Sequence, residues 1–303
     1  MTFAAMIGSI ELGLIYSVMA LGVFLSYRTL NTPDLTVDGS IVTGAAVSAM
    51  VCSIGGNPYL ALILAFITGC MAGSVTALLN TKLKIQPLLS GILVMLGLYS
   101  INLRIMGGKS NIALTKSNTI YKSFHEVFSN EYSSLLMGVM ILTIITICFY
   151  YFLNTRMGFA LRATGDNEDM VKASGINSDA MRLVGLAISN GLVALAGGML
   201  AQHQSYTDVG MGVGMVVIGL ASVIIGEAVF GTKSLIRRLM AVSLGAILYR
   251  FIIALALNLG MPATDLKLVS AVIVTIALST GMMGGLPTFK LSFLKRKGGV
   301  NHA

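Results

Sequence analysis

The chain has 303 residues, of which 55% are hydrophobic and 11% are charged, and its formal net charge is +8. Soluble domains carry about 25% charged residues, so this composition excludes an ordinary soluble protein and indicates a polytopic helical membrane protein in contact with lipid. The positive charge does not indicate nucleic acid as a partner, because the cations lie in short loops between apolar segments and form no single basic patch.

Hydropathy predicts about nine membrane-spanning helices, with eight and ten as alternatives because several apolar segments contain Gly or Pro. We treat residues 1–303 as one all-α transmembrane domain. The first span has no basic stretch before it and no small-residue cleavage site, so we expect it to be retained and not removed as a signal peptide. The predicted spans are 4–26, 37–54, 59–79, 88–106, 135–153, 183–201, 213–226, 239–257 and 266–286.

The linker Leu30–Ser40 (LNTPDLTVDGS) separates the first two predicted spans. Pro33 cannot continue a helix through this linker. Polar side chains can satisfy the backbone groups that Pro33 leaves free, and the candidates are Asp34, Thr36 and Asp38. We therefore expect a break between the first two helices.

Small residues that follow this linker recur later in the chain at the same spacing. The second predicted span runs outward and the seventh runs inward, so the match predicts an inverted repeat with broken helices at equivalent places. A chance match in a Gly-rich chain is the alternative. The matched pairs are Gly39 with Gly214, Gly44 with Gly219, and Ala46 with Ala221.

Other small residues recur at four-residue spacing within single spans. This pattern lets membrane helices approach closely, so we expect the residues to lie at helix–helix contacts. The pairs are Gly69 with Gly73, Ala187 with Gly191, and Ala194 with Gly198.

The segment 107–134 is the longest predicted outer loop and carries several aromatic residues. Phe124 and Phe128 lie four residues apart, with Tyr121 and Tyr132 nearby, which predicts one aromatic face of a short helix. This face can be an anchor at the membrane interface or a landing surface for an extracytoplasmic receptor. The composition favours the anchor.

The segment Asn154–Arg182 is a long polar interval in an otherwise apolar chain, with four cations and four acids. Asp166 is the predicted N-cap of a short helix, which has acids in its first turn. Lys172 lies near the end of this helix, and Gly175 provides a C-terminal stop. Such a capped helix between two membrane spans can transmit force to a protein docked on it.

The distribution of cations predicts the orientation in the membrane. With residues 154–182 in the cytoplasm, we count 14 of the 20 Lys and Arg residues on the cytoplasmic side and the other 6 outside or within the membrane. This excess agrees with the positive-inside rule. It predicts an outer N-terminus and a cytoplasmic C-terminal tail at 288–303.

Two groups of residues are candidates for the wall of a transport pathway. Ser189 and Asn190 lie near the middle of the sixth predicted span, where polar groups line a route or bond to another helix. Alternate glycines at the outer end of the seventh span favour an irregular helix start that can serve as a gate. These are Gly210, Gly212 and Gly214.

The motifs of common catalytic sites are missing from the sequence. Leu103–Ser110 reads LRIMGGKS, which lacks the first glycine of a phosphate-binding P-loop and lies on the predicted outer side. The sequence shows no paired carboxylates, no Ser-His-Asp order and no metal-ligand spacing. We therefore expect a non-catalytic subunit without a cofactor. Glu11 is the one carboxylate well inside a predicted span, which favours a partner ATPase over a proton relay as the energy source.

Several motifs resemble bacterial ABC importer permeases of the branched-chain amino acid and ribose type. They are LRATGDN at 161–167, ASGIN at 173–177, Ala196-Gly197-Gly198 in the next span, and PDLTVDGS in the first linker. In that family the central segment forms a coupling helix that docks into a cleft of a cytoplasmic ATPase. The resemblance places this helix at Asp166–Gly175, with Met170 and Val171 as apolar contacts. The implied coupling residues are Asp166, Asn167, Glu168, Asp169, Met170, Val171, Lys172 and Gly175.

The same resemblance implies the partners and the mechanism. It implies two permease copies, which we expect to form a homodimer, two cytoplasmic ABC ATPase subunits and an extracytoplasmic solute-binding lipoprotein. ATP binding closes the ATPase pair and moves the coupling helices together. The solute expected is an amino acid, and the linker is similar to the tryptophan- or tyrosine-type subgroup. An ion-gradient-driven secondary transporter or channel is the alternative, and a membrane enzyme is a third class without a candidate catalytic pair.

Overall fold

The computed structural model describes residues 3–128, 132–262, 265–266, 268–272 and 275, and these residues are largely helical. Eight helices in this part of the chain are long and apolar enough to cross a membrane, which confirms the all-α polytopic prediction. The ninth predicted span, 266–286, falls mostly outside the described residues, and the tail 288–303 falls wholly outside them. The elements are α1 (Phe3–Val23), η1 (Phe24–Thr29), α2 (Thr36–Ser53), α3 (Pro58–Thr81), α4 (Pro87–Ile105), β1 (Asn111–Ala113), α5 (Ile120–Phe128), α6 (Ser133–Leu153), α7 (Arg156–Asp166), α8 (Glu168–Ala173), α9 (Ser178–Gln204), β2 (Tyr206–Asp208), η2 (Val209–Gly212), α10 (Met215–Phe230) and α11 (Leu235–Asn258).

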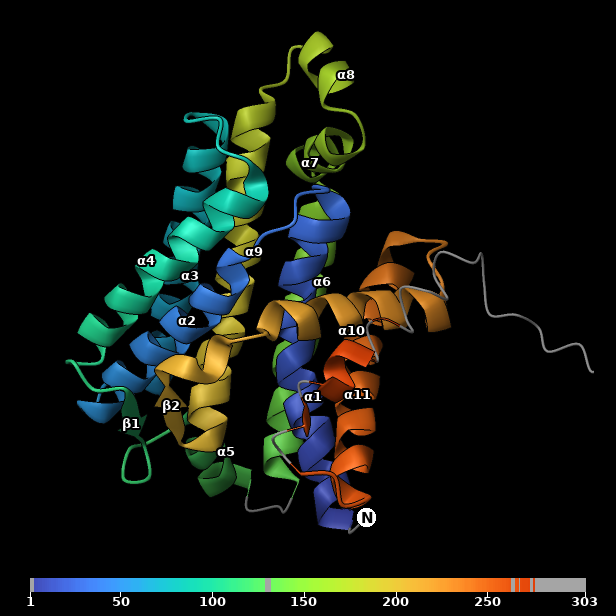
Figure 1. Cartoon of the computed structure of the whole chain (residues 1–303). Coiled ribbons are helices and arrows are strands. Elements are labelled where there is room, and N and C mark those ends of the chain that lie inside the picture. The colour runs from blue at the N-terminus through green and yellow to red at the C-terminus, as the bar shows by residue number, and fades with distance from the viewer. Residues whose placement is uncertain (1–2, 129–131, 263–264, 267, 273–274, 276–303) are drawn as a thin grey trace, which may run out of the picture.

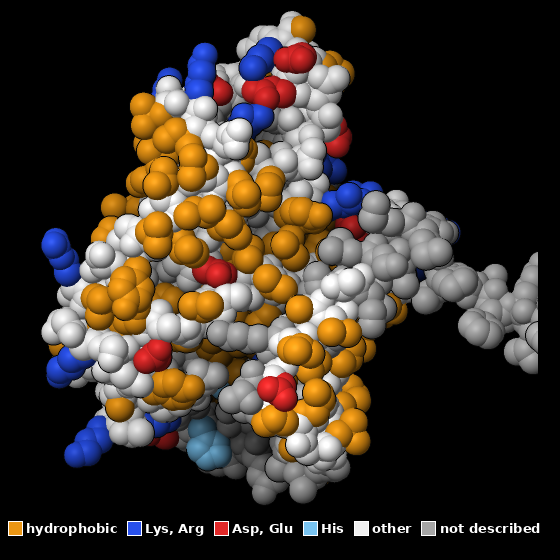
Figure 2. All heavy atoms as spheres, in the orientation of Figure 1, with side chains coloured by type: hydrophobic (Ala, Val, Ile, Leu, Met, Phe, Trp, Pro, Cys, Tyr) orange, Lys and Arg blue, Asp and Glu red, His pale blue; other side chains and the backbone are white. Residues whose placement is uncertain are grey.

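The long helices form a bundle whose two ends differ. Helices α7 and α8 lie at one end, and α5, β1, β2 and the N-terminus lie at the opposite end (Figure 1). Hydrophobic side chains cover the middle of the face in Figure 2, while Lys, Arg, Asp and Glu gather at the end formed by α7 and α8. An apolar belt between two polar ends is the surface of a multi-pass membrane protein.

Helices α1, α2 and α9 form the centre of the bundle, and α4 and α6 lie at its edge. In the most apolar part of each span, 72% of the residues of α1, α2 and α9 are buried, against 22% for α6. Glycines let the central backbones meet. A Cβ on Gly44 would lie 1.8 Å from the Ala194 carbonyl oxygen, and one on Gly73 would lie 2.1 Å from that of Leu186. The close packing expected of the small residues is thus observed for Gly73 and for the α2–α9 contact.

The first linker breaks the chain between α1 and α2, as Pro33 predicts. Helix α1 continues as the π-helical segment η1 up to Thr29, and α2 begins at Thr36. The Asp34 carboxylate accepts a hydrogen bond from the Thr36 backbone N–H at 2.8 Å. The side chain after the proline therefore satisfies a backbone group at the start of α2, which is the role predicted for it.

The predicted inverted repeat has partial support in the packing of the helices. Helix α3 packs against α9 and α11 packs against α1, so helices from the first and second parts of the chain lie side by side in two similar contacts. Gly44 of α2 faces α9, and Gly219 of α10 faces α1. Gly39 lies inside α2, however, whereas Gly214 precedes α10, so this matched pair does not occupy equivalent places.

The end of the bundle opposite α8 is built from residues 107–128 and 132–134 and from the chain after α9. Strands β1 and β2 pair antiparallel, with Ile112 opposite Thr207. Helix α5 forms as predicted, but Tyr121 and Phe124 are buried, so these two aromatic rings form neither a membrane anchor nor an exposed landing surface. The Gln202 side-chain oxygen accepts a hydrogen bond from the Ile120 N–H at 2.8 Å, which holds α5 against α9.

Candidate functional site

The polar interval after α6 contains two helices, although the sequence predicted one. The Thr155 hydroxyl accepts a hydrogen bond from the Gly158 N–H at 3.2 Å and caps α7. Helix α7 lies against η1, where a Cβ on Gly165 would lie 1.9 Å from the Thr29 carbonyl oxygen. Leu161, a residue of α7, is fully buried. These contacts fix α7 against the bundle, and α8 follows α7 and projects beyond it at the tip of the molecule (Figure 1).

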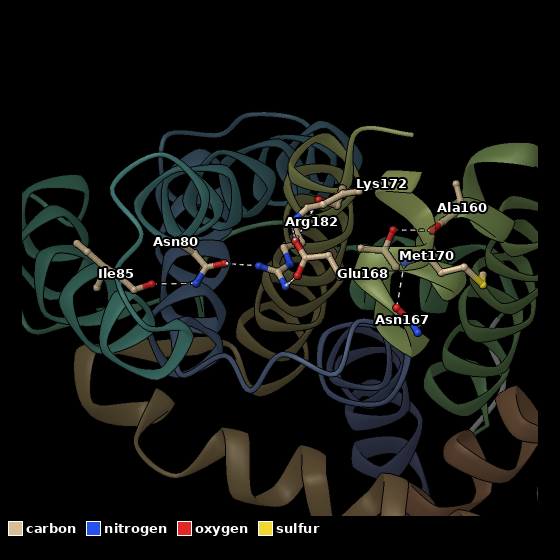
Figure 3. Close-up of polar contacts among 10 residues, drawn as sticks. Asn80, Ile85, Ala160, Asn167, Glu168, Met170, Lys172 and Arg182 are labelled. Atoms are coloured by element: carbon tan, nitrogen blue, oxygen red, sulfur yellow. Dashed lines mark hydrogen bonds and ion pairs between the residues drawn. The ribbon is translucent and has the colours of Figure 1, made fainter. Parts of the chain in front are cut away.

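Helix α8 begins at Glu168, and its N-cap is Asn167. The predicted cap, Asp166, is wrong, because Asp166 is the last residue of α7. Asn167 has the extended backbone that a cap requires, and its side-chain oxygen accepts a hydrogen bond from the Met170 N–H at 3.0 Å (Figure 3). Gly175 follows the helix with φ +78°, a left-handed conformation suited to glycine, as its predicted role as a stop requires.

Glu168 joins α8 to the start of α9. Its carboxylate accepts hydrogen bonds from Lys172 at 2.9 Å and from the Ser178 hydroxyl at 3.1 Å, and it forms an ion pair with Arg182 (Figure 3). The hydrogen bond from Lys172 lowers the pKa of Glu168 below its ordinary value, and Arg182 and Ser178 act in the same direction, while partial burial opposes them. The carboxylate is therefore ionised at neutral pH and holds the two helices together.

Arg182 extends this connection to the turn between α3 and α4. Its second terminal nitrogen donates to the Asn80 side-chain oxygen at 3.5 Å, and the Asn80 amide donates to the Ile85 carbonyl oxygen at 2.9 Å (Figure 3). A displacement of α8 is thus connected through Glu168 and Arg182 to two membrane-spanning helices. Sequence reasoning missed Arg182 and Asn80 because 102 residues separate them.

The residues proposed to contact an ATPase differ in their exposure. Met170 is 57% exposed, whereas Val171 is 2% exposed and faces the protein. The expectation that Val171 contacts a partner is therefore wrong, because its side chain lies on the buried side of α8 and packs against the rest of the protein. The remaining predicted coupling residues on the outer surface of this segment are Asp166, Asn167, Asp169, Lys172 and Gly175.

Ser189 and Asn190 lie in the interior of the bundle and bond to other helices. The Ser189 hydroxyl donates to the Gly22 carbonyl oxygen of α1 at 2.7 Å. The Asn190 amide donates to Asp34 at 2.6 Å, and its side-chain oxygen accepts from the Ser40 hydroxyl at 2.7 Å. Both residues are fully buried, so the inter-helix alternative describes their contacts, and a role in a pathway stays a prediction.

The three alternate glycines form the irregular start of α10, as predicted. Gly210 and Gly212 belong to the short 3₁₀ segment η2, and Gly214 has φ +89° immediately before α10. The Asp38 carboxylate of α2 accepts hydrogen bonds from the Gly214 N–H at 2.9 Å and the Val216 N–H at 2.7 Å. A side chain of α2 thus caps α10, whose N-cap residue Gly214 lies 176 positions later in the chain, a contact that no local pattern could reveal.

The described residues contain no group of three or more His, Cys, Asp or Glu side chains placed to hold a metal ion. Cys52, Cys70 and Cys148 are free thiols.

Comparison with known protein families agrees with this arrangement of membrane helices. Residues 5–279 match the model of the family described as branched-chain amino acid transport system / permease component. The chain belongs to this permease family. Members of the family are transport permease subunits and not enzymes, and this chain is accordingly a multi-pass protein of the plasma membrane.

Individual relatives cover most of the chain. A tyrosine transport system permease protein of Clostridioides difficile is 44% identical over 268 residues, which is 88% of each chain. The ribose import permease protein RbsC of Escherichia coli is 25% identical over 86% of this chain and 80% of its own. A probable branched-chain amino acid transport permease protein LivH of Methanocaldococcus jannaschii is 26% identical over 64% of this chain and 66% of its own. No solved structure matches the chain significantly.

Proposed function

We propose that this permease forms the translocation pathway of an ABC importer for an amino acid, and that α8 is the helix on which a separate ATPase acts. The position of α8 carries the proposal. It lies beyond the end of the bundle, exposes Met170, and is tied by Glu168 and Arg182 to helices that enter the membrane. A helix so placed can receive a push and pass it to α3 and α9.

An aromatic amino acid is the solute that the relatives favour. The tyrosine transport permease shares 44% identity with this chain, against 25% for the ribose permease. An extracytoplasmic binding protein would deliver the solute at the end formed by α5, β1 and β2. Selection of the solute would then rest with that protein.

The complete transporter would contain two permease copies, most simply a homodimer, and two ATPase subunits. Helices α4 and α6 expose large apolar side chains such as Leu96, Tyr99 and Ile144, which lipid or a second copy would cover. The alternative of a transporter driven by an ion gradient has less support, because the matched family is that of permease components.

The coupling proposal can be tested by replacing Met170 with glutamate in the assembled transporter. A buried apolar contact contributes more than 1 kcal/mol at the centre of an interface, so ATPase association and ATP-dependent uptake should each fall about tenfold. Association is measured by co-purification, and uptake with radiolabelled tyrosine in proteoliposomes.

Met157→Glu is the matched control, because Met157 is also exposed but lies at the start of α7. It should leave both quantities near their original values. Normal ATPase association and normal uptake in the Met170→Glu protein would refute the assignment of α8. Uptake that persists without any ATPase would refute the wider proposal.

A further inference from the structure

A cavity of about 430 Å³ lies at the α7–α8 end of the bundle, apart from the contacts of α8. Its walls come from η1, from α7, and from the turn that joins α10 to α11 together with the first residues of α11. It lies where two membrane spans finish, since the spans Ala5–Thr29 and Val209–Phe230 both end beside it.

Cations dominate the charge of this cavity. Four of its lining residues, Arg28, Arg162, Lys233 and Arg238, are basic, and one, Asp166, is acidic. The charge of Arg28 is offset, because its Nε lies 3.2 Å from a carboxylate oxygen of Glu227. The other three cations outnumber the single carboxylate, so the cavity attracts an anion.

Arg162 presents donors that the described residues leave unsatisfied. Its guanidinium stacks over the Phe159 ring, with Cζ 4.4 Å from the ring centroid. Its Nε and one terminal nitrogen, Nη2, are shielded from solvent and have no hydrogen-bond partner in the described part of the chain. Buried donors without partners are costly and uncommon, so an anion in the cavity would be favoured if a turn of the Arg162 side chain brought these donors to it.

The start of α11 adds backbone donors to the same cavity. Ser234 caps this 24-residue helix by accepting a hydrogen bond from the Arg237 N–H at 3.4 Å. The first N–H groups of a helix have no partner within it and carry partial positive charge. Ser234 and Leu235 line the cavity, so these groups lie beside the three cations. Arginine donors together with a helix N-terminus are a combination suited to phosphate.

We propose that this cavity binds a phosphate group, presented either by an anionic phospholipid or as free inorganic phosphate. Basic pockets at the ends of membrane helices on the positively charged side suit anionic headgroups, and Phe24 and Phe159 provide apolar surface beside the charges. The bound phosphate joins α7, which carries α8, to the α10–α11 turn. The site thereby stiffens the base of the coupling segment without touching α8 itself.

The experiment uses the full-length chain purified in an uncharged detergent. Native mass spectrometry measures retention of phosphatidylglycerol against phosphatidylcholine, and thermal shift measures the effect of millimolar inorganic phosphate. The test variants are Arg162→Gln, Arg238→Gln and Lys233→Gln. Arg156→Gln is the control, because Arg156 is an exposed arginine of α7 outside the cavity lining.

Loss of one charge-assisted hydrogen bond should weaken anion binding about tenfold in Arg162→Gln and Arg238→Gln, and leave it unchanged in Arg156→Gln. Preferential retention of phosphatidylglycerol assigns the phosphate to lipid, and a phosphate-induced thermal shift that the variants abolish assigns it to free phosphate. Lys233→Gln keeps the test valid if Arg162→Gln fails to fold.

Three results would overturn the proposal. The first is equal retention of the two lipids together with no phosphate shift. The second is an equal loss of binding in Arg156→Gln. The third is a set of variants that lose ATPase association but bind lipid and phosphate normally, which would make the cavity a protein interface.

Discussion

The centre of the bundle and the α7–α8 end are held together in different ways. At the centre, glycines bring the backbones of α2, α3 and α9 into direct contact, and buried polar groups such as Asp34 and Asn190 satisfy each other. At the α7–α8 end, the links are ion pairs of partly exposed side chains around Glu168, with Val171 buried beneath them.

This difference separates the part that must stay rigid from the part that can respond. Backbones in contact leave no room for a change in side-chain volume, so the centre is intolerant of substitution. Partly exposed ion pairs each contribute little because water competes with them, so α8 can shift at small cost. If α8 is the helix on which the ATPase acts, as proposed, the adjustable links lie where force is received and the fixed contacts lie inside the membrane.

The largest effect is expected for Gly44→Val. The added Cβ alone would lie 1.8 Å from the Ala194 carbonyl oxygen, so α2 and α9 must separate. We expect a loss of about 3 kcal/mol or more of stability and little folded protein on size exclusion. Gly97→Val in α4 is the control, because a Cβ there meets no atom within 4 Å. Equal yields of the two variants would contradict the difference in packing between the centre and the edge of the bundle.

A smaller effect is expected for Asn190→Leu, which keeps the volume but removes the hydrogen bonds to Asp34 and Ser40. Unpaired buried polar groups should cost about 1–3 kcal/mol, measured as a lower temperature at which the detergent-solubilised chain unfolds. The exposed Asn258, replaced by Leu, is the control. If Asn190→Leu instead abolishes uptake with unchanged thermal stability, the residue serves the pathway and not the packing.

The smallest effect on stability is expected at Glu168. Its pKa is lowered in the folded chain, so the stabilisation is complete above the ordinary value of 4.5 and is lost as the pH falls through the lowered pKa. We expect amide exchange in α8, corrected for its intrinsic pH dependence, to be constant near neutral pH and to rise only below pH 4.5. Glu168→Gln should show fast exchange at every pH, with global stability reduced by at most about 1 kcal/mol. Protection in α8 that disappears at neutral pH in the unaltered chain would disprove this account.

Much of the fold could be predicted from local features of the sequence. The spans follow from runs of apolar residues, the break before α2 from Pro33, and the end of α8 from Gly175. The cap of α8 was assigned to Asp166 and is Asn167, because either residue type can cap a helix and the packing of α7 on η1 decides where the chain becomes extended. Val171 was assigned to a partner contact, but it is buried. A hydrophobic side chain fits a contact with a partner as well as a contact inside the protein, so the sequence could not distinguish the two.

Hydropathy and backbone constraints act over a few consecutive residues. For this reason the order of residues suffices to show that this protein is helical, that it lies in the membrane, and where its long polar interval interrupts the spans. The tertiary structure alone decided that Asp38 caps α10, that Asn190 bonds to Asp34, and that Arg182 reaches Asn80. These contacts join residues more than 100 positions apart, so their partners depend on how the helices assemble and not on the residues nearby.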